Sequence, residues 1–218
     1  MKVISFSLWG DDKKYLTGAI KNAQIASTIY PEWICRYYIG KDVPIETINI
    51  LNSFDNTDTV QMSENGGWKN GTLWRFQEIS KDEVTIMISR DCDSRLNYRE
   101  KEAVNKWILS DKKFHIMRDH PHHNVPILAG MFGCKKGIIK NINQLINNYN
   151  HITHKQNDQN FLKKIIYPIV KDDSMVHDPF FAKNDFPTKR IDNEFVGEVY
   201  DENDNPNEND RKALNKHL

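Results

Sequence analysis

Short apolar runs alternate with amphipathic stretches along the first ninety residues of the chain. The apolar runs predict strands at residues 3–8, 33–39, 57–62 and 84–88. Apolar residues recur at helical spacing in the segments at 15–30, 45–54 and 72–80. This β-α-β-α-β order predicts a parallel sheet with right-handed crossovers, of the kind that binds nucleotides. The run at 84–88, VTIMI, reads as a strand that is buried on both faces.

The second half of the chain carries weaker and shorter patterns. They predict helices at 97–109, 138–149 and 155–166, and strands at 114–117, within 125–134, and at 195–200. Residues 175–178 form a short, isolated segment that changes from apolar to polar. Residues 201–210 are rich in Asn, Asp and Glu, which is typical of disordered segments. We therefore expect one α/β domain over 1–200 and a polar, disordered tail or linker over 201–218.

Composition narrows the class of protein. Thirty basic residues balance thirty acidic ones, so no basic excess favours nucleic-acid binding. The three cysteines are far apart and form neither a zinc pattern nor a disulfide framework, which indicates a reducing compartment. The N-terminus is too short and too soon charged for a signal peptide, and no segment is long enough to span a bilayer. We expect a soluble, cytoplasmic protein without a transmembrane segment.

Two aspartates, Asp91 and Asp93, follow the strand at 84–88. Open α/β sheets bind ligands outside the carboxyl ends of their strands, and carboxylate oxygens suit Mg²⁺ or Mn²⁺. Arg90 and Arg95 flank the pair, which fits an anionic ligand and equally a plain salt bridge. The alternative for this stretch is an acidic turn that caps the next helix.

Several other side chains could serve such a site. His177 with Lys183 six residues later could place a metal ligand and a phosphate contact together, although a half-buried histidine is as common. The histidines around Pro121 favour a polar, substrate-facing loop over zinc, because proline breaks any shared helix face. Arg75 could bind a phosphate, orient the first aspartate or form a surface ion pair. Aromatic residues that could stack on a base or sugar, or simply pack the core, are Trp9, Tyr15, Trp68 and Trp74.

This order of elements resembles the glycosyltransferases of the GT-A fold, in which an N-terminal nucleotide-binding half precedes a strand ending in Asp-x-Asp. The sequence DQNFL at 158–162 resembles an element of the glycogenin-like and galactosyltransferase-like branch. His177 and Lys183 reproduce the outer spacing of that branch's His-x-x-Gly-x-x-Lys, although Phe180 replaces the glycine and Lys163 replaces the asparagine that closes the Asp-Gln element. Residues 127–132 resemble the strand beneath the donor sugar. The stretch from 90 to 133 is also similar to uncharacterised viral and bacterial glycosyltransferase-like proteins, which would imply the host cytoplasm for a viral protein.

The resemblance implies a GT-A fold with a mixed, mostly parallel sheet and a set of site roles. Asp91, Asp93 and His177 would hold Mn²⁺ or Mg²⁺, and Lys183 would contact the diphosphate. Leu8, Trp9 and Gly10 would flank the nucleobase, and Arg75, Arg90 and Asp91 would approach the nucleotide. Asp158 and Gln159 would face the donor sugar. Asp158 or Asp119 would be the base of an inverting enzyme, whereas Gln159 or the leaving phosphate would assist in a retaining one.

The implied activity is transfer of a sugar, in a hexosyltransferase-like reaction, from a nucleoside-diphosphate sugar to a glycan or other hydroxyl acceptor. A UDP-sugar is the favoured donor. A nucleotidyltransferase shares the nucleotide-binding half and the metal, but its first loop is usually rich in Gly, Lys and Arg, where this chain has the acidic LWGDD. A non-catalytic module that binds nucleotide sugars is the third interpretation.

Overall fold

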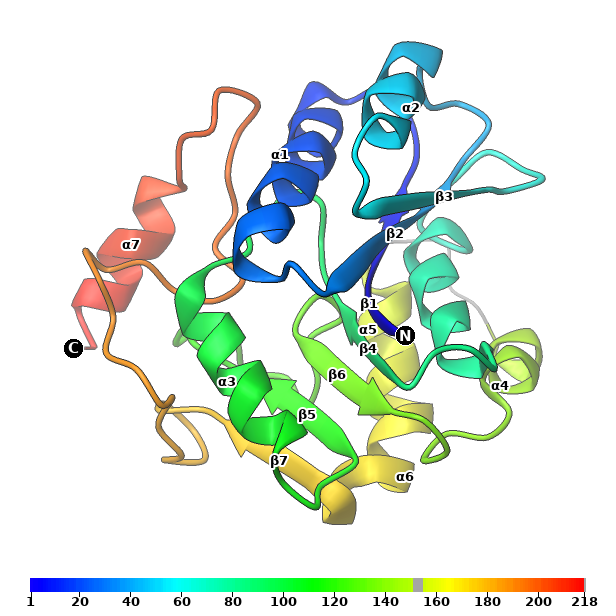
Figure 1. Cartoon of the computed structure of the whole chain (residues 1–218). Helices are drawn as coiled ribbons and strands as arrows, with labels where there is room; N and C mark the ends of the chain where they lie inside the picture. Colours follow the sequence, from blue (N-terminus) through cyan, green and yellow to red (C-terminus); the bar gives the residue numbers. More distant parts are fainter. Residues whose placement is uncertain (151–154, 218) are drawn as a thin grey trace.

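The computed structural model describes residues 1–150 and 155–217. A seven-stranded sheet runs through the molecule in the order β3-β2-β1-β4-β6-β5-β7 (Figure 1). Its strands are β1 Lys2–Leu8, β2 Trp33–Ile39, β3 Thr57–Gln61, β4 Ile86–Ser89, β5 Phe114–Met117, β6 Phe132–Lys135 and β7 Ser174–His177. Only β6 runs antiparallel to its neighbours β4 and β5, and the other pairs are parallel. The predicted mixed, mostly parallel sheet is therefore confirmed.

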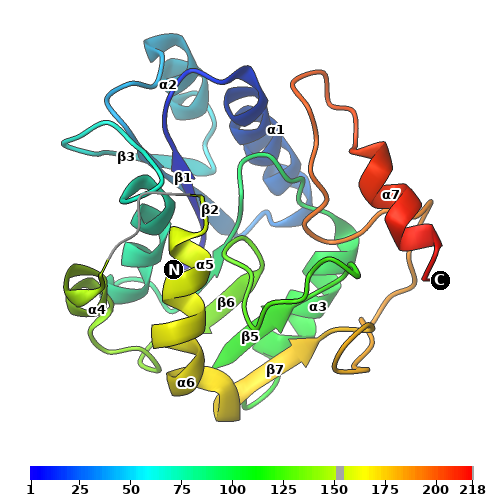
Figure 2. The same cartoon turned by 180° about the vertical axis from the view of Figure 1, so that it is seen from behind.

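Helices cover both faces of this sheet (Figures 1 and 2). One face carries α1 Lys13–Ile29, α2 Ile45–Asn52 and α3 Tyr98–Ile108. The other carries the 3₁₀ helix η1 Gly71–Ser80, α4 Ile142–Asn148, α5 Asn157–Phe161, the π-helical turn η2 Leu162–Ile166, α6 Tyr167–Val170 and the short turn η3 Lys171–Asp173. Because side chains alternate along a strand, Phe6 of β1 packs in the core under α1 and α3, whereas Val3 packs with Phe76 of η1 on the opposite side.

Two predicted strands differ from the structure. The apolar run at 125–134 forms a strand only from Phe132, because the residues before it make turns, and Ser89 Oγ donates to the carbonyl of Ala129 within them. The strand predicted at 195–200 is wrong: Val199 and Tyr200 make only isolated bridges, with Ser94 and Pro206 respectively. The backbone turns there at Gly197, whose φ of +83° suits glycine and ends extended pairing.

The polar segment after residue 200 contains the helix α7 Glu208–Asn215. Its Leu214 is buried, and Arg211 forms an ion pair with the buried Glu198 at 2.5 Å. In Figures 1 and 2, α7 lies at the edge of the molecule, on the same side as α1 and α3. The division of the chain at residue 200 stays a prediction, and residue 218 of the predicted tail lies outside the described residues. None of the described helices combines the length and apolar character needed to cross a membrane.

The sheet topology determines where ligands can bind. Every strand except β6 points the same way, so the carboxyl ends of β1, β4, β5 and β7 share one edge of the sheet. Loops that leave this edge carry most of the side chains predicted to be functional. This is the edge at which open α/β sheets bind their ligands.

Candidate functional site

A cavity of about 740 Å³ opens at this edge, between the loop after β1, the turn after β4, η1 and the start of α5. Its lining contains eight of the residues to which the family resemblance assigns a site role. They are Leu8, Trp9, Gly10, Arg75, Asp91, Asp93, Asp158 and Gln159. Residues separated by up to 151 positions in the sequence therefore meet in one place.

The turn that carries the two aspartates is held firmly by α1. Asn22 of α1 donates to the carbonyl of Ser94 at 2.9 Å and accepts from the backbone N–H of Leu96 at 3.1 Å. A Cβ on Gly18 would lie 1.9 Å from the carbonyl oxygen of Cys92, so only glycine allows α1 this close to the turn. Cys92 points inward, and its Sγ lies 3.4 Å from the carbonyl oxygen of Ser7. The two aspartates on either side of it face the cavity.

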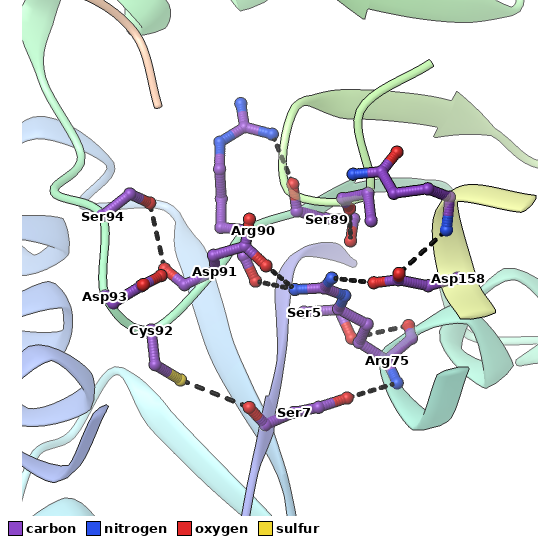
Figure 3. Close-up of polar contacts among 12 residues, drawn as sticks. Ser5, Ser7, Arg75, Ser89, Arg90, Asp91, Cys92, Asp93, Ser94 and Asp158 are labelled. Carbon is purple, nitrogen blue, oxygen red and sulfur yellow. Dashed lines mark hydrogen bonds and ion pairs between the residues drawn. The ribbon is translucent and has the colours of Figure 1, made fainter. Parts of the chain in front are cut away.

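Arg75 joins the two acidic elements of the site (Figure 3). Its Nη1 donates to Asp91 Oδ1 at 2.5 Å and to the carbonyl of Arg90 at 2.9 Å, while Nη2 donates to Asp158 Oδ2 at 3.2 Å. The side chain is only 5% exposed. Its backbone is fixed to β1, because its N–H donates to Ser7 Oγ and its carbonyl accepts from Ser5 Oγ. The guanidinium is thus a fixed bridge between Asp91 and Asp158.

Asp93 has a separate counter-ion, Lys14, whose Nζ lies 2.8 Å from Asp93 Oδ2. Burial raises the pKa of Asp93, and the nearby charge of Asp91 raises it further, although Lys14 opposes both. Burial and the same aspartates raise the pKa of Tyr15, which lines the cavity, to about 12. These directions indicate that negative charge is crowded here.

The charge balance of the cavity decides which ligands it can hold. Of the described residues that line it, five are aspartates (Asp11, Asp12, Asp91, Asp93 and Asp158) and only Arg75 and Lys155 are basic. A nucleoside diphosphate would be repelled by this lining unless a cation came with it. Carboxylate oxygens are the ligands that Mg²⁺ and Mn²⁺ prefer, so the donor set fits a divalent cation.

Gly130 lies opposite Asp91 and leaves room for its carboxylate. A Cβ on Gly130 would lie 2.0 Å from Asp91 Oδ2 and 2.5 Å from Asp91 Cγ. Any larger residue at 130 would push the Asp91 side chain out of place. Nearly half of the Asp91 side chain is exposed, so a bound cation could reach it from the cavity.

Asp158 lies at the start of α5 with its carboxylate directed at Arg75. Burial raises its pKa to about 6, against the lowering effect of the Arg75 guanidinium. The next residue, Gln159, lines the cavity with a buried Oε1 that has no hydrogen-bond partner among the described residues. The pair therefore offers one titrating carboxylate and one unused acceptor to a ligand.

Aromatic side chains form one wall of the cavity. Trp9 meets Trp68 edge to face, with ring centroids 6.0 Å apart, and meets Trp74 in the same way at 6.3 Å. A Cβ on Gly66 would lie 2.0 Å from Trp9 Cβ, so this loop approaches the ring closely. Trp9, Trp68 and Tyr15 line the cavity, whereas Trp74 is buried behind them. The exposed ring faces are suited to stacking on a base or a sugar.

Two predicted site residues form buried ion pairs away from the cavity. Arg90 is 2% exposed and donates to Glu100 of α3 at 3.1 Å, so its charge is neutralised beneath the sheet edge rather than offered to a nucleotide. Asp119 is fully buried between Arg99 and Arg190, and its Oδ2 also accepts the N–H of Val196. With both oxygens engaged, Asp119 is not positioned as a base for an acceptor in this cavity.

His177 and Lys183 are not brought to the cavity either. β7 lies at the far end of the sheet, three strand positions beyond β4. His177 is 2% exposed, and its Nδ1 is 2.8 Å from Nε2 of His115. Lys183 lines a different cavity. The structure therefore does not group His177 with Asp91 and Asp93, and their proposed shared metal site is reduced to the two aspartates.

A third group of possible metal ligands lies at the histidine loop. Ligand atoms of His120, His122 and Asp210 lie within 4.8 Å of one another. However, His120 Nε2 is 2.8 Å from the carbonyl oxygen of Asp210, and its Nδ1 accepts from the N–H of His122 at 3.1 Å. Both ring nitrogens of His120 are thus already used, so this group fits a metal less well than the two aspartates.

The buried His177 should make the fold sensitive to acid. Burial lowers its pKa to about 4, whereas an unfolded histidine titrates near 6.5. Between these pH values the unfolded chain binds a proton that the folded chain does not, so stability falls as the pH falls. We expect His177→Gln to reduce the slope of unfolding free energy against pH by up to about 1.4 kcal/mol per pH unit. Urea unfolding between pH 7.5 and 4.5 measures this slope, with the exposed His217→Gln as control. An unchanged slope in His177→Gln would contradict the assignment.

Sequence reasoning missed Lys14, which lies in the first turn of α1. A signal was present, since a helix that follows a strand begins at the carboxyl edge of the sheet. Asp12 caps this helix by accepting the N–H of Lys14. The first turn of α1 and the turn after β4 therefore meet at the same edge of the sheet.

Comparisons with known proteins identify the fold. No family model matches the sequence, and no curated protein matches it. Among solved structures, a glycosyltransferase involved in glycosylation of the major capsid of PBCV-1 has a TM-score of 0.54 at 16% identity, covering 82% of this chain and 81% of its own. The 4-diphosphocytidyl-2C-methyl-D-erythritol synthase of Anaerococcus prevotii has a TM-score of 0.52 at 13% identity, covering 81% and 85%. A galactosyltransferase in complex with donor and acceptor sugar analogues has a TM-score of 0.49 at 12% identity, covering 82% and 74%. The resemblance to the GT-A glycosyltransferases is thus confirmed at the level of the fold.

Proposed function

We propose that the protein is a metal-dependent glycosyltransferase that moves a sugar from a nucleoside-diphosphate sugar, with UDP favoured, to a hydroxyl of a glycan or other acceptor. The observation that carries the proposal is the charge of the cavity. Five aspartates beside an aromatic wall form a poor site for a diphosphate alone and a suitable one for a diphosphate accompanied by a divalent cation. The fold likeness to a glycosyltransferase supports the same conclusion.

In this proposal Asp91 and Asp93 would hold Mn²⁺ or Mg²⁺. When bound, the cation would neutralise the diphosphate and stabilise the charge that develops on it as it leaves. Arg75 fixes the orientation of Asp91 through its bond to Oδ1. Trp9 and Trp68 would stack on the base, with Leu8 and Gly10 at the same loop.

The donor sugar would lie toward α5 in this arrangement. The unpaired Oε1 of Gln159 would accept a hydrogen bond from a sugar hydroxyl, which would satisfy a buried acceptor. Asp158, ionised above pH 6, would take the proton of the acceptor hydroxyl in an inverting reaction. Lys155, at the same rim, is the second basic side chain available to the donor phosphates.

A nucleotidyltransferase is the second candidate. The fold likeness to 4-diphosphocytidyl-2C-methyl-D-erythritol synthase, a nucleotidyltransferase, favours it. Against it, the loop after β1 brings Asp11 and Asp12 into the cavity, where the triphosphate of such an enzyme needs basic residues and flexible glycines. A module that binds nucleotide sugars without turnover would use the same cavity.

One assay separates these functions. The full chain is incubated with a panel of nucleotide sugars and Mn²⁺ or Mg²⁺, with and without chelator, and release of nucleoside diphosphate is measured. A parallel set contains nucleoside triphosphates and sugar phosphates, with pyrophosphate release as the readout. Chelator-sensitive diphosphate release from one donor supports the proposal, whereas pyrophosphate release supports the nucleotidyltransferase. Metal-dependent binding without turnover across an acceptor panel supports the binding module, and no metal-dependent binding contradicts all three.

The pKa of Asp158 gives a further expectation for the proposed activity. Since a base must be ionised, kcat/KM should fall as the pH drops below about 6. Asp158→Asn should lower kcat/KM by about 10²–10⁴-fold. It should also remove the fall in kcat/KM below about pH 6. The exposed Asp82→Asn serves as control and should keep both rate and profile. If kcat/KM of Asp158→Asn still falls below about pH 6, Asp158 is not the base.

Asp158 should also affect stability, with the opposite sign from His177. The folded chain holds a proton on Asp158 between about pH 4 and 6, where an unfolded aspartate has already lost it. The contribution of Asp158 therefore becomes less favourable as the pH rises through this window. Because Asp158→Asn removes this contribution, its unfolding free energy should become more favourable relative to the parent as the pH rises from about 4 to about 6, and urea unfolding checks this without any activity assay.

A further inference from the structure

A second cavity, of about 540 Å³, lies past the end of β7. It is enclosed by the loop at 179–190, Arg99 of α3 and His217 beyond α7. It shares no lining residue with the first cavity. β7 is three strand positions beyond β4, so the two cavities lie past the ends of different strands of the sheet.

The second cavity has the opposite charge from the first. Of the described residues that line it, four are permanently or usually cationic (Arg99, Lys183, Lys189 and Arg190), and one, Asp185, is acidic. Neither lysine forms an ion pair within the described part of the chain. Their ammonium groups are therefore available to a ligand.

A single carboxylate holds both arginines in place. Arg99 forms two hydrogen bonds with Asp119, at 2.8 and 3.0 Å, and Arg190 Nη2 donates to Asp119 Oδ1 at 2.6 Å. The Arg99 guanidinium also lies over the ring of Phe186, 4.3 Å from its centroid. One negative charge faces two positive ones, so this wall keeps a net positive charge in a fixed geometry.

Two buried donors at this wall lack partners among the described residues. They are Nη1 of Arg190 and Oγ1 of Thr188. The Arg190 side chain is only 10% exposed, and burial lowers its pKa, although Asp119 opposes that effect. A buried donor without an acceptor is unfavourable, and an oxyanion in the cavity would supply acceptors.

The loop that carries Lys183 is ordered by its own hydrogen bonds. Asp178 accepts the backbone N–H groups of Phe180, Phe181 and Ala182, and its Oδ2 also accepts from Arg118 Nε at 2.7 Å. Lys183 itself has a φ of +56°, in the left-handed region. This fixed turn directs the lysine to the cavity before any ligand arrives, which lowers the entropy lost on binding.

We propose that this second cavity is a binding site for an oxyanion, a phosphate or carboxylate group carried by a small molecule. The cationic lining, the fixed arginine pair and the two unpaired donors each point to that chemistry. The site is independent of the proposed transferase activity, because none of its residues lines the first cavity.

Calorimetric titration of the full chain with inorganic phosphate, and separately with acetate, tests this site. Lys183→Ala and Lys189→Ala each remove one charge from the lining. The matched control is the exposed Lys140→Ala, which lines neither cavity, and Lys155→Ala reports on any phosphate that binds in the first cavity instead. The Lys183→Ala and Lys189→Ala variants should each bind phosphate about tenfold more weakly, as expected for loss of one charge-assisted contact, with Lys140→Ala unchanged.

The outcomes are distinct. Saturable binding weakened in both pocket variants alone supports the proposal, and the ratio of phosphate to acetate affinity identifies the kind of oxyanion. Absence of saturable binding by either anion overturns it. Binding that is weakened only in Lys155→Ala would place the anion in the first cavity and overturn the proposal. Equal weakening in all four variants would reflect nonspecific attraction and would also overturn it. None of these results depends on turnover, so a failure of the proposed transferase activity remains distinguishable.

Discussion

Asp93→Asn is expected to lower the metal-dependent kcat/KM by about 10³-fold while leaving the fold intact. Asparagine keeps an oxygen that can accept from Lys14 Nζ, so the change removes charge and not shape. In the parent, burial and the charge of Asp91 already disfavour ionised Asp93, so neutralising it should not lower the melting temperature. The measurement is kcat/KM against Mn²⁺ concentration, alongside the melting temperature.

Asp11→Asn is the matched control, because Asp11 lines the same cavity and carries the same charge. If the cavity only needs negative charge in general, both variants should lose the same activity. If Asp93 holds the cation, only Asp93→Asn should raise the Mn²⁺ concentration needed for half-maximal rate. An Asp93→Asn variant with the metal dependence of the parent would contradict the assignment.

The parts of the site that sequence patterns located are those where chemistry directly follows a strong local element. Asp91 and Asp93 follow the continuous apolar run of β4, and Trp9 follows β1. Because parallel strands end at one edge, strand order alone brings these loops together. The same reasoning explains why the Asp158-Gln159 pair, which begins a helix of the second half, was harder to place than the two aspartates.

His177 and Lys183 show what the spacing of a motif does not determine. Their six-residue spacing matches a family motif, but spacing within a loop does not determine which strand the loop leaves. β7 pairs with β5 at the far end of the sheet, and this carries both residues away from the two aspartates. The partner of a buried charge is equally hard to predict from sequence. Arg90 was expected at the nucleotide, but in the structure it pairs with Glu100 of the next helix.

The net charge of the chain concealed the strongest electrostatic feature of the structure. Thirty acidic and thirty basic residues give a formal net charge of zero, with no excess of either sign. The fold instead gathers aspartates in the cavity after β1 and β4, and lysines and arginines in the cavity after β7. Because this separation arises from tertiary contacts between distant loops, no sum over the sequence could reveal it.

Arg75→Met is expected to destabilise the protein by about 3–5 kcal/mol, because it leaves buried carboxylate charge without its counter-ion. Arg75 is 5% exposed and contacts Asp91, Asp158 and the carbonyl of Arg90. The lost energy is a large part of the 5–15 kcal/mol that typically holds a domain together. Urea unfolding at pH 7 measures it, and Asp158 should titrate at a still higher pH in the variant, since Arg75 lowers its pKa in the parent.

The double variant Arg75→Met with Asp158→Asn distinguishes loss of charge pairing from loss of packing. If the unpaired Asp158 charge causes the instability, removing that charge should recover part of the stability, and the two effects will not add. The exposed pair Lys2 and Glu32 provides the contrast, since Lys2→Met there should change stability by less than about 1 kcal/mol. Strict additivity in the Arg75–Asp158 cycle would mean that methionine at 75 disturbs the attachment of η1 to β1 instead. In that case the carboxylates of the cavity would not depend on this arginine for their charge balance, and Lys14, Lys155 and the bound cation would have to provide it.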